Sequence, residues 1–309
     1  MADIDGDGRL EILCGGDDEH VHVLDDQGRE IRSHHMTEQL IVGQGGTTGP
    51  GVNCLLAADI NGDGRIEILV GCTNSQLSAF DPDFNRLWNR GAIYHGVRRL
   101  SVSEGFTEGA TVIFAADHYG SVHVIGSTGD YVGRAYSELG DVAYDIGDID
   151  GDGRLEIVNG SGTGVATAFD ADLSKLWEFN NHGYNNRHVV CRCVDGDGAH
   201  EALVASDTGF VYALKGDGST LWQTDLGSPV YALCAIGPES GPPMLAAGLA
   251  SGQTVVLNAS GQVRTTHEGT APIKFIYDAG STDDGCPMLV VVDTSERLTV
   301  LAPSTPLFV

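Results

Sequence analysis

Apolar positions along the chain occur in short runs, and most of these runs alternate with polar positions. Four successive runs at residues 52–58, 68–72, 77–80 and 86–89 show the pattern, with Gly, Asp, Pro and Asn between them. A period of two, combined with β-branched and aromatic residues, is typical of strands with one buried face. No stretch keeps the period of about 3.6 residues that an amphipathic helix requires. The sequence therefore predicts an all-β protein built from short antiparallel strands.

One strand pattern that ends in a large apolar residue recurs seven times. The first copy ends at Leu24, and the last residues of the other six, which lie 43 to 45 residues apart, are Phe80, Ile125, Phe169, Leu214, Leu257 and Leu301. A period of about 40–45 residues with four short strands per unit is the signature of β-propeller blades. We therefore predict a single seven-bladed β-propeller domain over residues 1–309, made of four-stranded antiparallel blades. The blades are expected at about residues 1–38, 52–96, 97–140, 141–185, 186–229, 230–271 and 272–309.

The two ends of the chain differ in this scheme. The turn that follows the innermost strand of other repeats already begins at residue 3, so the first blade is expected to lack that strand. The last blade is expected to finish with residues 306–309. Because an open inner position leaves buried backbone groups without partners, we expect the chain to be a fragment of a longer protein.

Three tryptophans occupy the same place in their repeats. Trp88, Trp177 and Trp222 each follow a Leu in the outermost predicted strand. A role in docking a cofactor is conceivable for such residues, but large aromatic side chains contribute most by burial. We expect the three to pack between blades.

A nine-residue acidic segment recurs four times, each time just before an apolar run. Its pattern is Asp-x-Asp/Asn-x-Asp-Gly-x-x-Glu, and it occupies residues 3–11, 59–67, 148–156 and, as a variant, 193–201. Calcium prefers six to eight oxygen ligands, and alternating acids on a tight glycine turn supply them. Without a cation, so many like charges would repel one another. Acidic turns are common on protein surfaces, but four copies with one internal order favour calcium in at least some of them.

Two of the four copies depart from the full pattern. Asn61 takes the middle acidic position of the second copy and still offers an oxygen. Cys193 replaces the first Asp of the fourth copy, and a thiol is a poor calcium ligand. Calcium in the fourth loop therefore stays an open question at this point.

These loops and their spacing resemble the FG-GAP/VCBS-type repeat family, which includes the propeller of integrin α subunits. The resemblance covers nearly the whole chain, and it implies that loop positions one, three, five and nine bind calcium through side chains while position seven uses its carbonyl. The implied ligands are Asp3, Asp5, Asp7, the Arg9 carbonyl, Glu11, Asp59, Asn61, Asp63, the Arg65 carbonyl, Glu67, Asp148, Asp150, Asp152, the Arg154 carbonyl, Glu156, Asp195, Asp197, the Ala199 carbonyl and Glu201. Three to four structural Ca²⁺ ions are expected.

Other segments resemble this pattern less closely. Residues 103–107 and 236–240 have lost most of the ligands and are expected to be metal-free, while the longer segment 278–288 is left open. A second resemblance is to PQQ-type repeats, seen in residues 79–81 with 87–88 and again in 168–170 with 176–177. That family includes quinone-dependent dehydrogenases and also non-catalytic propellers, so this likeness does not transfer chemistry.

The charge and the cysteines bear on partners and compartment. The net charge is −26, with 43 acids and 17 bases, which makes nucleic acid and anionic membranes poor partners. Loops of this kind bind calcium at about 10⁻⁴–10⁻³ M in extracellular modules, so an extracellular, surface or periplasmic location is expected. The seven cysteines are odd in number and sit mostly in strand patterns, which indicates buried thiols and argues mildly for an intracellular protein.

The face opposite the calcium loops is a candidate ligand site, because links between blades gather His, Tyr and Arg there. The candidate ligand-binding residues are His34, His35, Arg90, Tyr94, His95, Arg98, His182, Tyr184, Arg187 and His188. On so acidic a chain, arginines near one rim would suit an anionic or sugar ligand. Ordinary polar loops, with the arginines paired to nearby acids, are the alternative.

Three functional hypotheses follow. The first is a calcium-stabilised, non-catalytic interaction or adhesion module of a secreted or surface protein, with an unidentified protein or carbohydrate ligand. The second is a propeller enzyme, either a PQQ-dependent oxidoreductase or a polysaccharide-cleaving enzyme, although no nucleophile motif such as Gly-x-Ser-x-Gly is present. The third is an intracellular scaffold. We expect no catalytic residues and no membrane insertion.

Overall fold

The computed structural model describes residues 1–37, 40–42, 46–91, 93, 96–107, 109–137, 143–237, 242–281 and 287–301. These residues form strands, turns and bends without a helix, which confirms the predicted all-β class. Within them, no helix is long and apolar enough to span a membrane. The chain divides into two compact units, Met1–Tyr136 and Ser137–Val309, and each is taken by itself below.

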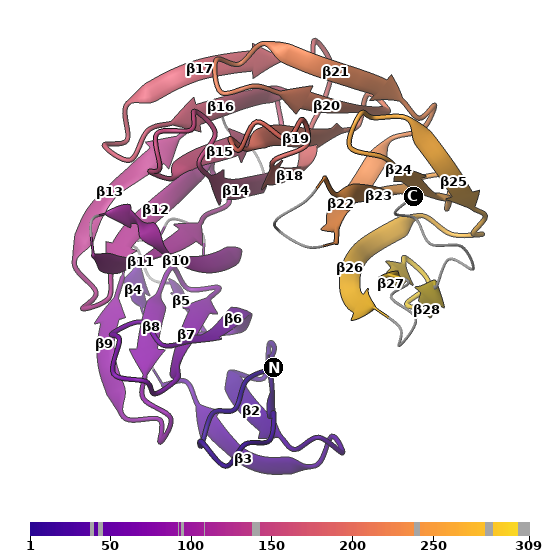
Figure 1. Cartoon of the computed structure of the whole chain (residues 1–309). Coiled ribbons are helices and arrows are strands. Elements are labelled where there is room, and N and C mark those ends of the chain that lie inside the picture. The colour runs from indigo at the N-terminus through magenta and orange to yellow at the C-terminus, as the bar shows by residue number, and fades with distance from the viewer. Residues whose placement is uncertain are drawn as a thin grey trace. The chain divides into compact units, whose positions relative to one another are not determined.

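The first unit contains three antiparallel sheets and one separate hairpin (Figure 1). In each sheet the strands lie side by side in chain order, as in a simple meander. The three sheets are β1 (Ile12–Gly15), β2 (His20–Leu24) and β3 (Glu30–His35); β6 (Val52–Ala58), β7 (Glu67–Cys72), β8 (Leu77–Phe80) and β9 (Arg86–Arg90); and β10 (Arg99–Thr107), β11 (Ala110–Ala116), β12 (Ser121–Gly126) and β13 (Tyr131–Tyr136).

The second unit contains four further sheets of the same kind, visible from magenta to yellow in Figure 1. They are β14 (Ala143–Gly147), β15 (Glu156–Gly160), β16 (Val165–Phe169) and β17 (Lys175–Asn180); β18 (Asn186–Arg192), β19 (Glu201–Ser206), β20 (Phe210–Leu214) and β21 (Thr220–Asp225); β22 (Val230–Ile236), β23 (Met244–Leu249), β24 (Thr254–Leu257) and β25 (Val263–His267); and β26 (Ile273–Ser281), β27 (Pro287–Asp293) and β28 (Leu298–Leu301). The chain thus has seven sheets of three or four described strands, in the order that the repeat predicts.

Burial changes in a regular way across each sheet. In the sheet β6–β9, every residue of β7 and β8 is buried, whereas β9 alternates between exposed and half-buried positions. In the four-stranded sheets the two central strands are largely covered on both faces, whereas β2 and β27 of the three-stranded sheets alternate between buried and half-buried positions. In the first unit, for example, Val21 and Val23 of β2 pack with Val52 and Val70 of the next sheet. One sheet cannot bury its own apolar faces, so this stacking supplies the core.

The three tryptophans fasten consecutive sheets, which confirms the expected packing role. The Nε1–H groups of Trp88, Trp177 and Trp222 donate to the carbonyls of Ser127, Gly216 and Ala259, at 2.8, 2.9 and 3.0 Å. In each case the acceptor lies in the turn between the third and fourth strands of the next sheet. A cofactor role therefore has no support at these positions.

A glycine in each of these turns makes room for the indole ring. The three glycines, Gly129, Gly218 and Gly261, all have φ between +75° and +84°. A Cβ added to Gly218 would lie 2.9 Å from the Trp177 ring, and the other two positions are as tight. Both the backbone conformation and the close approach of the ring therefore require glycine here.

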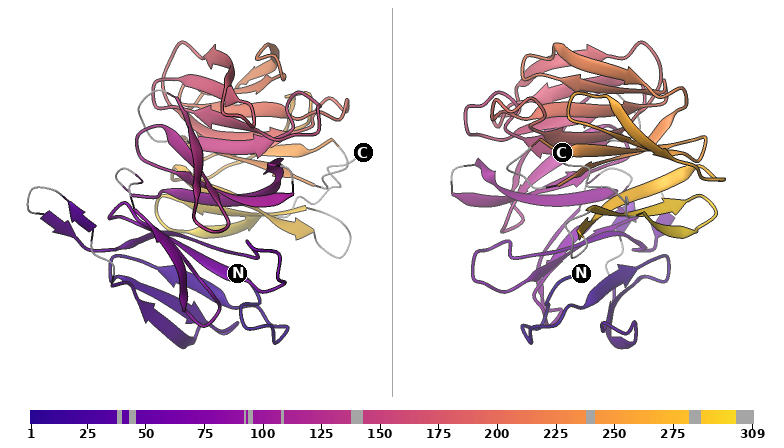
Figure 2. Two further views of the ribbon diagram at one scale, coloured as in Figure 1. Left: turned by 90° about the vertical axis from the view of Figure 1, so that its left-hand side faces the viewer. Right: turned by 45° about the vertical axis from the view of Figure 1, so that its right-hand side comes forward.

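The structure contains one element that the strand pattern did not predict. The link between residues 33 and 51, expected as an open connection, carries the hairpin β4 (Leu40–Val42) and β5 (Gly46–Thr48). In Figure 2 this dark purple hairpin projects from the side of the first unit. Only three residues per strand pair here, too few for a clear alternation in sequence.

The ends and the degenerate repeats also differ from the standard sheet. The sheet β1–β3 has three strands, and an isolated bridge from Ala2 to Glu11 occupies the place that Ala58–Glu67 takes in the next sheet. Residues 103–107 continue strand β10 instead of forming an acidic loop. The expected last strand at 306–309 lies outside the described residues, as do 238–240 and 282–286.

Candidate metal centres

The first acidic loop is built by its own carboxylates. The two oxygens of Asp3 accept the backbone N–H groups of Gly6 and Gly8, at 2.8 and 3.0 Å. Asp5 accepts from Asp7 at 3.1 Å, and Asp7 accepts from Arg9 at 2.8 Å. Gly6 and Gly8 have φ of +77° and +88°, which a side chain would disfavour. These bonds hold the carboxylates of Asp3, Asp5 and Asp7 along one tight turn.

The second and third loops repeat this geometry. Asp59 accepts from the glycines at 62 and 64, and Asp148 accepts from those at 151 and 153, all between 2.7 and 3.0 Å. In the second loop the Asn61 side chain accepts from Asp63 at 2.8 Å and donates to Glu67 at 3.1 Å. The amide thus holds the place of the missing acid, as the sequence predicts.

Each loop ends on a glutamate that enters the protein interior. Glu11, Glu67, Glu156 and Glu201 are between 1% and 5% exposed. One oxygen of each accepts the backbone N–H of the second loop residue, which is Ile4, Ile60, Ile149 or Val194, at 2.8 or 2.9 Å. Each glutamate thereby joins the end of its loop to the beginning.

Burial and neighbouring carboxylates act on these glutamates electrostatically. Desolvation raises the pKa of Glu156 to about 7, with a further contribution from the charges of Asp150, Asp148 and Asp152. Desolvation also raises the pKa of Glu67 and Glu201. A buried anion beside other anions is costly unless a cation compensates for it. The pKa of Asp59 shifts the other way. Backbone N–H groups that donate to its carboxylate, above all that of Gly64, lower it.

The donor set fits a hard divalent cation. In the first and third loops, ligand atoms of Asp3, Asp5 and Glu11, and of Asp148, Asp150 and Glu156, lie within 4.8 Å of one another. Carboxylate and carbonyl oxygens at this spacing match the preference of Ca²⁺. Such an ion would tie the turn to the buried end of the second strand and remove the repulsion at the glutamate. Calcium itself remains a prediction.

The fourth loop is less complete, as Cys193 implies. In the other three loops the first Asp accepts the N–H groups of two glycines. Among the described contacts of the fourth loop, Cys193 accepts no such bonds. Asp195 and Asp197 still accept the backbone N–H groups of residues 197 and 199. The Cys193 sulfur nevertheless lies within 4.8 Å of ligand atoms of Asp195 and Asp197. The implied ligand set omitted this thiol, and its presence makes the fourth loop softer than the others.

The arginines expected on the opposite face have partners inside the protein. Arg187 makes a double hydrogen bond to Asp207, with both distances at 2.8 Å, and its guanidinium lies 5.2 Å from the Tyr231 ring. Arg90 donates to the Gly129 carbonyl at 2.9 Å and stacks on Tyr131 at 4.8 Å. Arg90 thus contacts the next sheet, whereas Arg187 pairs with Asp207 of its own sheet and contacts Tyr231 of the next one. For these two residues the geometry favours the alternative given above, in which arginines of polar loops pair within the protein.

The remaining candidates on that face are divided between the two units, and each is described by itself. His34 stacks on Phe84 at 4.9 Å, and His35 pairs with Glu19 at 3.6 Å. Arg98, His182 and Tyr184 are exposed, while His188 is half-buried. Tyr94 and His95 lie outside the described residues. His34, His35, Arg90 and Arg98 belong to the first unit, and the candidates at 182, 184, 187 and 188 belong to the second.

The polar segment 180–188 is explained by a local network. The Asn181 amide donates to the carbonyl of Tyr184, the side chain of Asn186 and the hydroxyl of Ser206, at 2.7 to 2.9 Å. Asn185 donates to Asp207 at 2.7 Å. The side-chain amides of Asn181 and Asn185 thus hold this segment against the next sheet. Sequence composition alone does not reveal these contacts.

Histidines of the first sheet form a cluster that the sequence analysis did not single out. The His22 ring lies between Asp18 and Glu30, at 2.8 and 2.6 Å. These hydrogen bonds, first that of Asp18, raise the pKa of His22. His20 stacks on His35 with ring centroids 4.6 Å apart. Alternate positions on β2 point to one side, which is a signal that the sequence did carry.

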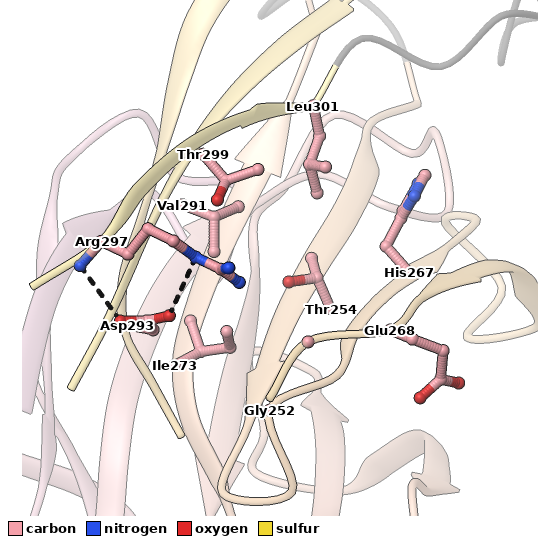
Figure 3. A pocket seen from close by; sticks show the side chains of 11 residues that line it. Gly252, Thr254, His267, Glu268, Ile273, Val291, Asp293, Arg297, Thr299 and Leu301 are labelled. Carbon is pink, nitrogen blue, oxygen red and sulfur yellow. Dashed lines mark hydrogen bonds and ion pairs between the residues drawn. The ribbon is translucent and has the colours of Figure 1, made fainter. Parts of the chain in front are cut away.

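The cavity drawn in Figure 3 lies between the last two sheets of the second unit and measures about 50 Å³. Asp293 and Arg297 are paired at 3.6 Å, and Asp293 also accepts from the backbone of Ser295 and Arg297. His267 and Glu268 lie on the opposite side of the view. The volume suits a few water molecules rather than a substrate.

Comparisons with known proteins agree with the loops and the sheets. A model of the FG-GAP-like repeat matches residues 3–70, which include the first two acidic loops. A model of the lambda-carrageenase β-propeller domain matches residues 156–270. No curated protein matches the sequence.

Solved structures share the fold across nearly the whole chain. A chain from the crystal structure of BBS1N in complex with ARL6DN, soaked with lead, has a TM-score of 0.68 at 12% identity; the match covers 98% of this chain and 91% of that one. The same complex soaked with mercury gives a TM-score of 0.68 at 11% identity, with the same coverage. Together, the repeat match, the propeller-domain match and this likeness identify the chain as an all-β protein with FG-GAP-like repeats and the seven-bladed β-propeller fold.

Proposed function

We propose that this protein is a calcium-binding β-propeller that serves as a non-catalytic interaction module of a secreted or surface protein. The observation that carries the proposal is the shared construction of the first three loops. In each, the first Asp accepts two glycine N–H groups, and a buried glutamate closes the loop. In the first and third loops this construction brings three carboxylate ligand atoms within 4.8 Å of one another, which suits the oxygen coordination of Ca²⁺.

The role of the metal in this proposal is structural. An ion held by a loop and by the buried glutamate binds the folded state only, so it stabilises that state by mass action. The affinity also bears on location. Extracellular calcium modules bind at about 10⁻⁴–10⁻³ M, whereas intracellular sensors bind at about 10⁻⁷–10⁻⁵ M.

Calorimetric titration of the metal-free protein with Ca²⁺ tests both parts. We expect at least three ions per chain with dissociation constants in the submillimolar to millimolar range. Micromolar or tighter binding would favour the intracellular scaffold, which the odd number of cysteines and their places in strand patterns also support. No heat of binding at any calcium concentration would contradict the proposal.

An interaction role is supported by the kind of neighbour that shares the fold. The solved chain belongs to a complex of two proteins, BBS1N and ARL6DN. For the present chain the partner is proposed only as a protein or carbohydrate ligand. The paired arginines at 90 and 187 also argue against an open catalytic funnel at those positions.

A carbohydrate-cleaving enzyme is the second candidate, and the match to the lambda-carrageenase propeller domain at residues 156–270 favours it. Incubation with λ-carrageenan and assay of new reducing ends decides between the two. We expect none above a heat-inactivated control. A steady increase that is proportional to protein concentration would replace the interaction module by the enzyme.

A further inference from the structure

A groove of about 710 Å³ lies on the first unit between the first two acidic loops. Asp3 and Asp5 of the first loop form one side, and Arg65 of the second loop forms the other. Arg32 of β3 and Asp83 of the turn after β8 complete it. The volume falls within the range of small-ligand and peptide side-chain sites, about 300–1,000 Å³.

Two guanidinium groups converge on one carboxylate in this groove. Arg32 Nη1 lies 3.9 Å from Asp83 Oδ1, and Arg65 Nη2 lies 3.7 Å from Asp83 Oδ2. Both distances exceed those of direct hydrogen bonds. The Asp83 side chain is 69% exposed, so this arrangement adds little to stability and a better-placed anion can displace it. Arg32 is held in place by Phe84, whose ring lies 5.1 Å below its guanidinium.

Calcium makes the groove less negative. Its charged lining residues are Arg32, Arg65, Asp3, Asp5 and Asp83, which is two positive and three negative charges and therefore a net charge of −1. Asp7 and Glu11 of the same loop bring this count to −3, and Ca²⁺ in the first loop, as the proposed function requires, reduces it to −1. An anion that approaches the two arginines is therefore repelled less with calcium than without it.

An equivalent groove in the second unit lacks this feature. It measures about 380 Å³ and lies between the third and fourth loops. Its charged lining residues are Asp150, Asp197, Glu201, Asp217 and Lys215, so four acids stand against one base. In the second unit the strand position equivalent to Arg32 is occupied by Trp177. Trp177 pairs with Ala168 across the strands, as Arg32 pairs with Val23. The arginine pair is therefore a property of the first groove rather than of the repeat.

We propose that the groove between the first two acidic loops binds an acidic segment of a partner protein, one of whose side-chain carboxylates replaces Asp83 between Arg32 and Arg65. This inference rests on the proposed calcium binding. A planar guanidinium group can donate two parallel hydrogen bonds to one carboxylate. Asp83 lies too far from both arginines to accept such bonds. Ile66 and Pro82 supply apolar wall for the peptide chain, and the lining contains no aromatic ring on which a sugar would stack.

The test uses a fluorescent peptide with three acidic residues flanked by glycines, titrated by anisotropy in millimolar Ca²⁺ and in EDTA. We expect saturable binding in calcium and at least about tenfold weaker binding in EDTA. The double variant R32Q/R65Q should lose about tenfold or more, because each arginine bond to a carboxylate is worth about a factor of ten. Asp83→Asn should strengthen binding severalfold, since it removes the internal competitor. Lys215→Gln, in the equivalent groove, is the matched control and should change nothing.

Native mass spectrometry of the same samples counts the bound calcium ions. It thereby distinguishes failure of this inference from failure of the proposed calcium binding. Calcium bound by the protein with equal peptide affinity in wild type and R32Q/R65Q would overturn this inference and leave the proposed function standing. Peptide binding that is the same in EDTA, with no calcium bound, would overturn both. Preference for a sulfated oligosaccharide of equal charge over the peptide would overturn the assignment of the ligand. Circular dichroism melts of each variant verify that the protein is folded.

Discussion

At the scale of single residues, the glutamate that closes each loop is the most constrained side chain of the candidate metal centres. Glu156 is 1% exposed and accepts one backbone hydrogen bond, while three aspartates of the same loop surround it. Its environment is unfavourable for an isolated charge and favourable for a charge shared with a dication. The effect of removing that charge should therefore depend on the metal.

The effect of Glu156→Gln on the free energy of unfolding is expected to change sign when calcium is added. In EDTA at mildly alkaline pH, the variant should be more stable than wild type, by at most about 2–3 kcal/mol, because a buried anion whose pKa is raised to about 7 is no longer present. In saturating Ca²⁺ it should be less stable, because a ligand is lost. Scanning calorimetry under both conditions measures this, with the exposed Glu178→Gln as the control. The same sign under both conditions would contradict a metal at this loop.

Cys193→Asp should complete the fourth loop. The new carboxylate can accept the N–H groups of Gly196 and Gly198, as Asp148 does for the glycines at 151 and 153. We expect about 1–2 kcal/mol of added stability from these bonds and a stronger calcium site. Calorimetric titration and urea unfolding measure both, and Cys193→Ser is the control that restores a polar group without the charge. An unchanged calcium affinity would show that the thiol is not what weakens the loop.

His22 should make the first unit more stable in acid than in base. Asp18 and Glu30 raise the pKa of His22 above its usual 6.5, so the protonated ring is favoured in the folded state. The added stability is fully present below pH 6.5 and is lost as the pH rises through the folded-state pKa. Urea unfolding of wild type and H22Q at about pH 5.5 and about pH 9 should give the larger difference at the lower pH. An equal difference would mean that the ring stays neutral.

At the scale of elements, three sheets are each fastened to the following sheet by a tryptophan of their fourth strand. Trp177 donates from one sheet to a turn of the next, and Gly218 leaves room for its ring. The same construction recurs at Trp88 and Trp222. A repeat therefore consists of a sheet together with a connection that fixes its neighbour, as expected for a fold in which each unit buries the next.

Gly218→Ala should be clearly more destabilising than Gly227→Ala. Both positions have positive φ, so each alanine costs about 1 kcal/mol in the backbone. Only at Gly218 does the new Cβ also meet a ring, 2.9 Å from Trp177, whereas nothing lies within 4 Å at Gly227. Overpacking adds about 1–3 kcal/mol at Gly218. Equal losses in urea unfolding would show that the tryptophan yields without cost.

Much of this level of structure is readable from sequence. The short apolar runs at residues 52–58 and 77–80, bounded by turn residues, predict β6 and β8 with the bounds that the structure shows. The period of two does not describe β8, because both of its faces are buried. The hairpin β4–β5 escapes such a prediction because three residues per strand carry no clear period. The partners of Asn181 escape it for another reason, since Asn186 and Ser206 lie on the following sheet.

At the scale of the whole molecule, calcium binding at the repeated loops would explain how the chain tolerates its strong negative charge. The chain carries a net charge of −26, and the loops concentrate carboxylates on short turns. Self-repulsion of this size destabilises a compact state unless ions offset it. Calcium at several loops would reduce the net charge and fasten the first two strands of several sheets. Chelation is therefore expected to lower the melting temperature by several degrees.

Counting the ions under native conditions tests this account most directly. Native mass spectrometry in millimolar calcium should find at least three ions per chain on the wild-type protein. The variant E11Q/E67Q/E156Q, whose fold is verified by circular dichroism, should hold none in its first three loops. A folded wild-type chain that carries no calcium under these conditions would contradict the account.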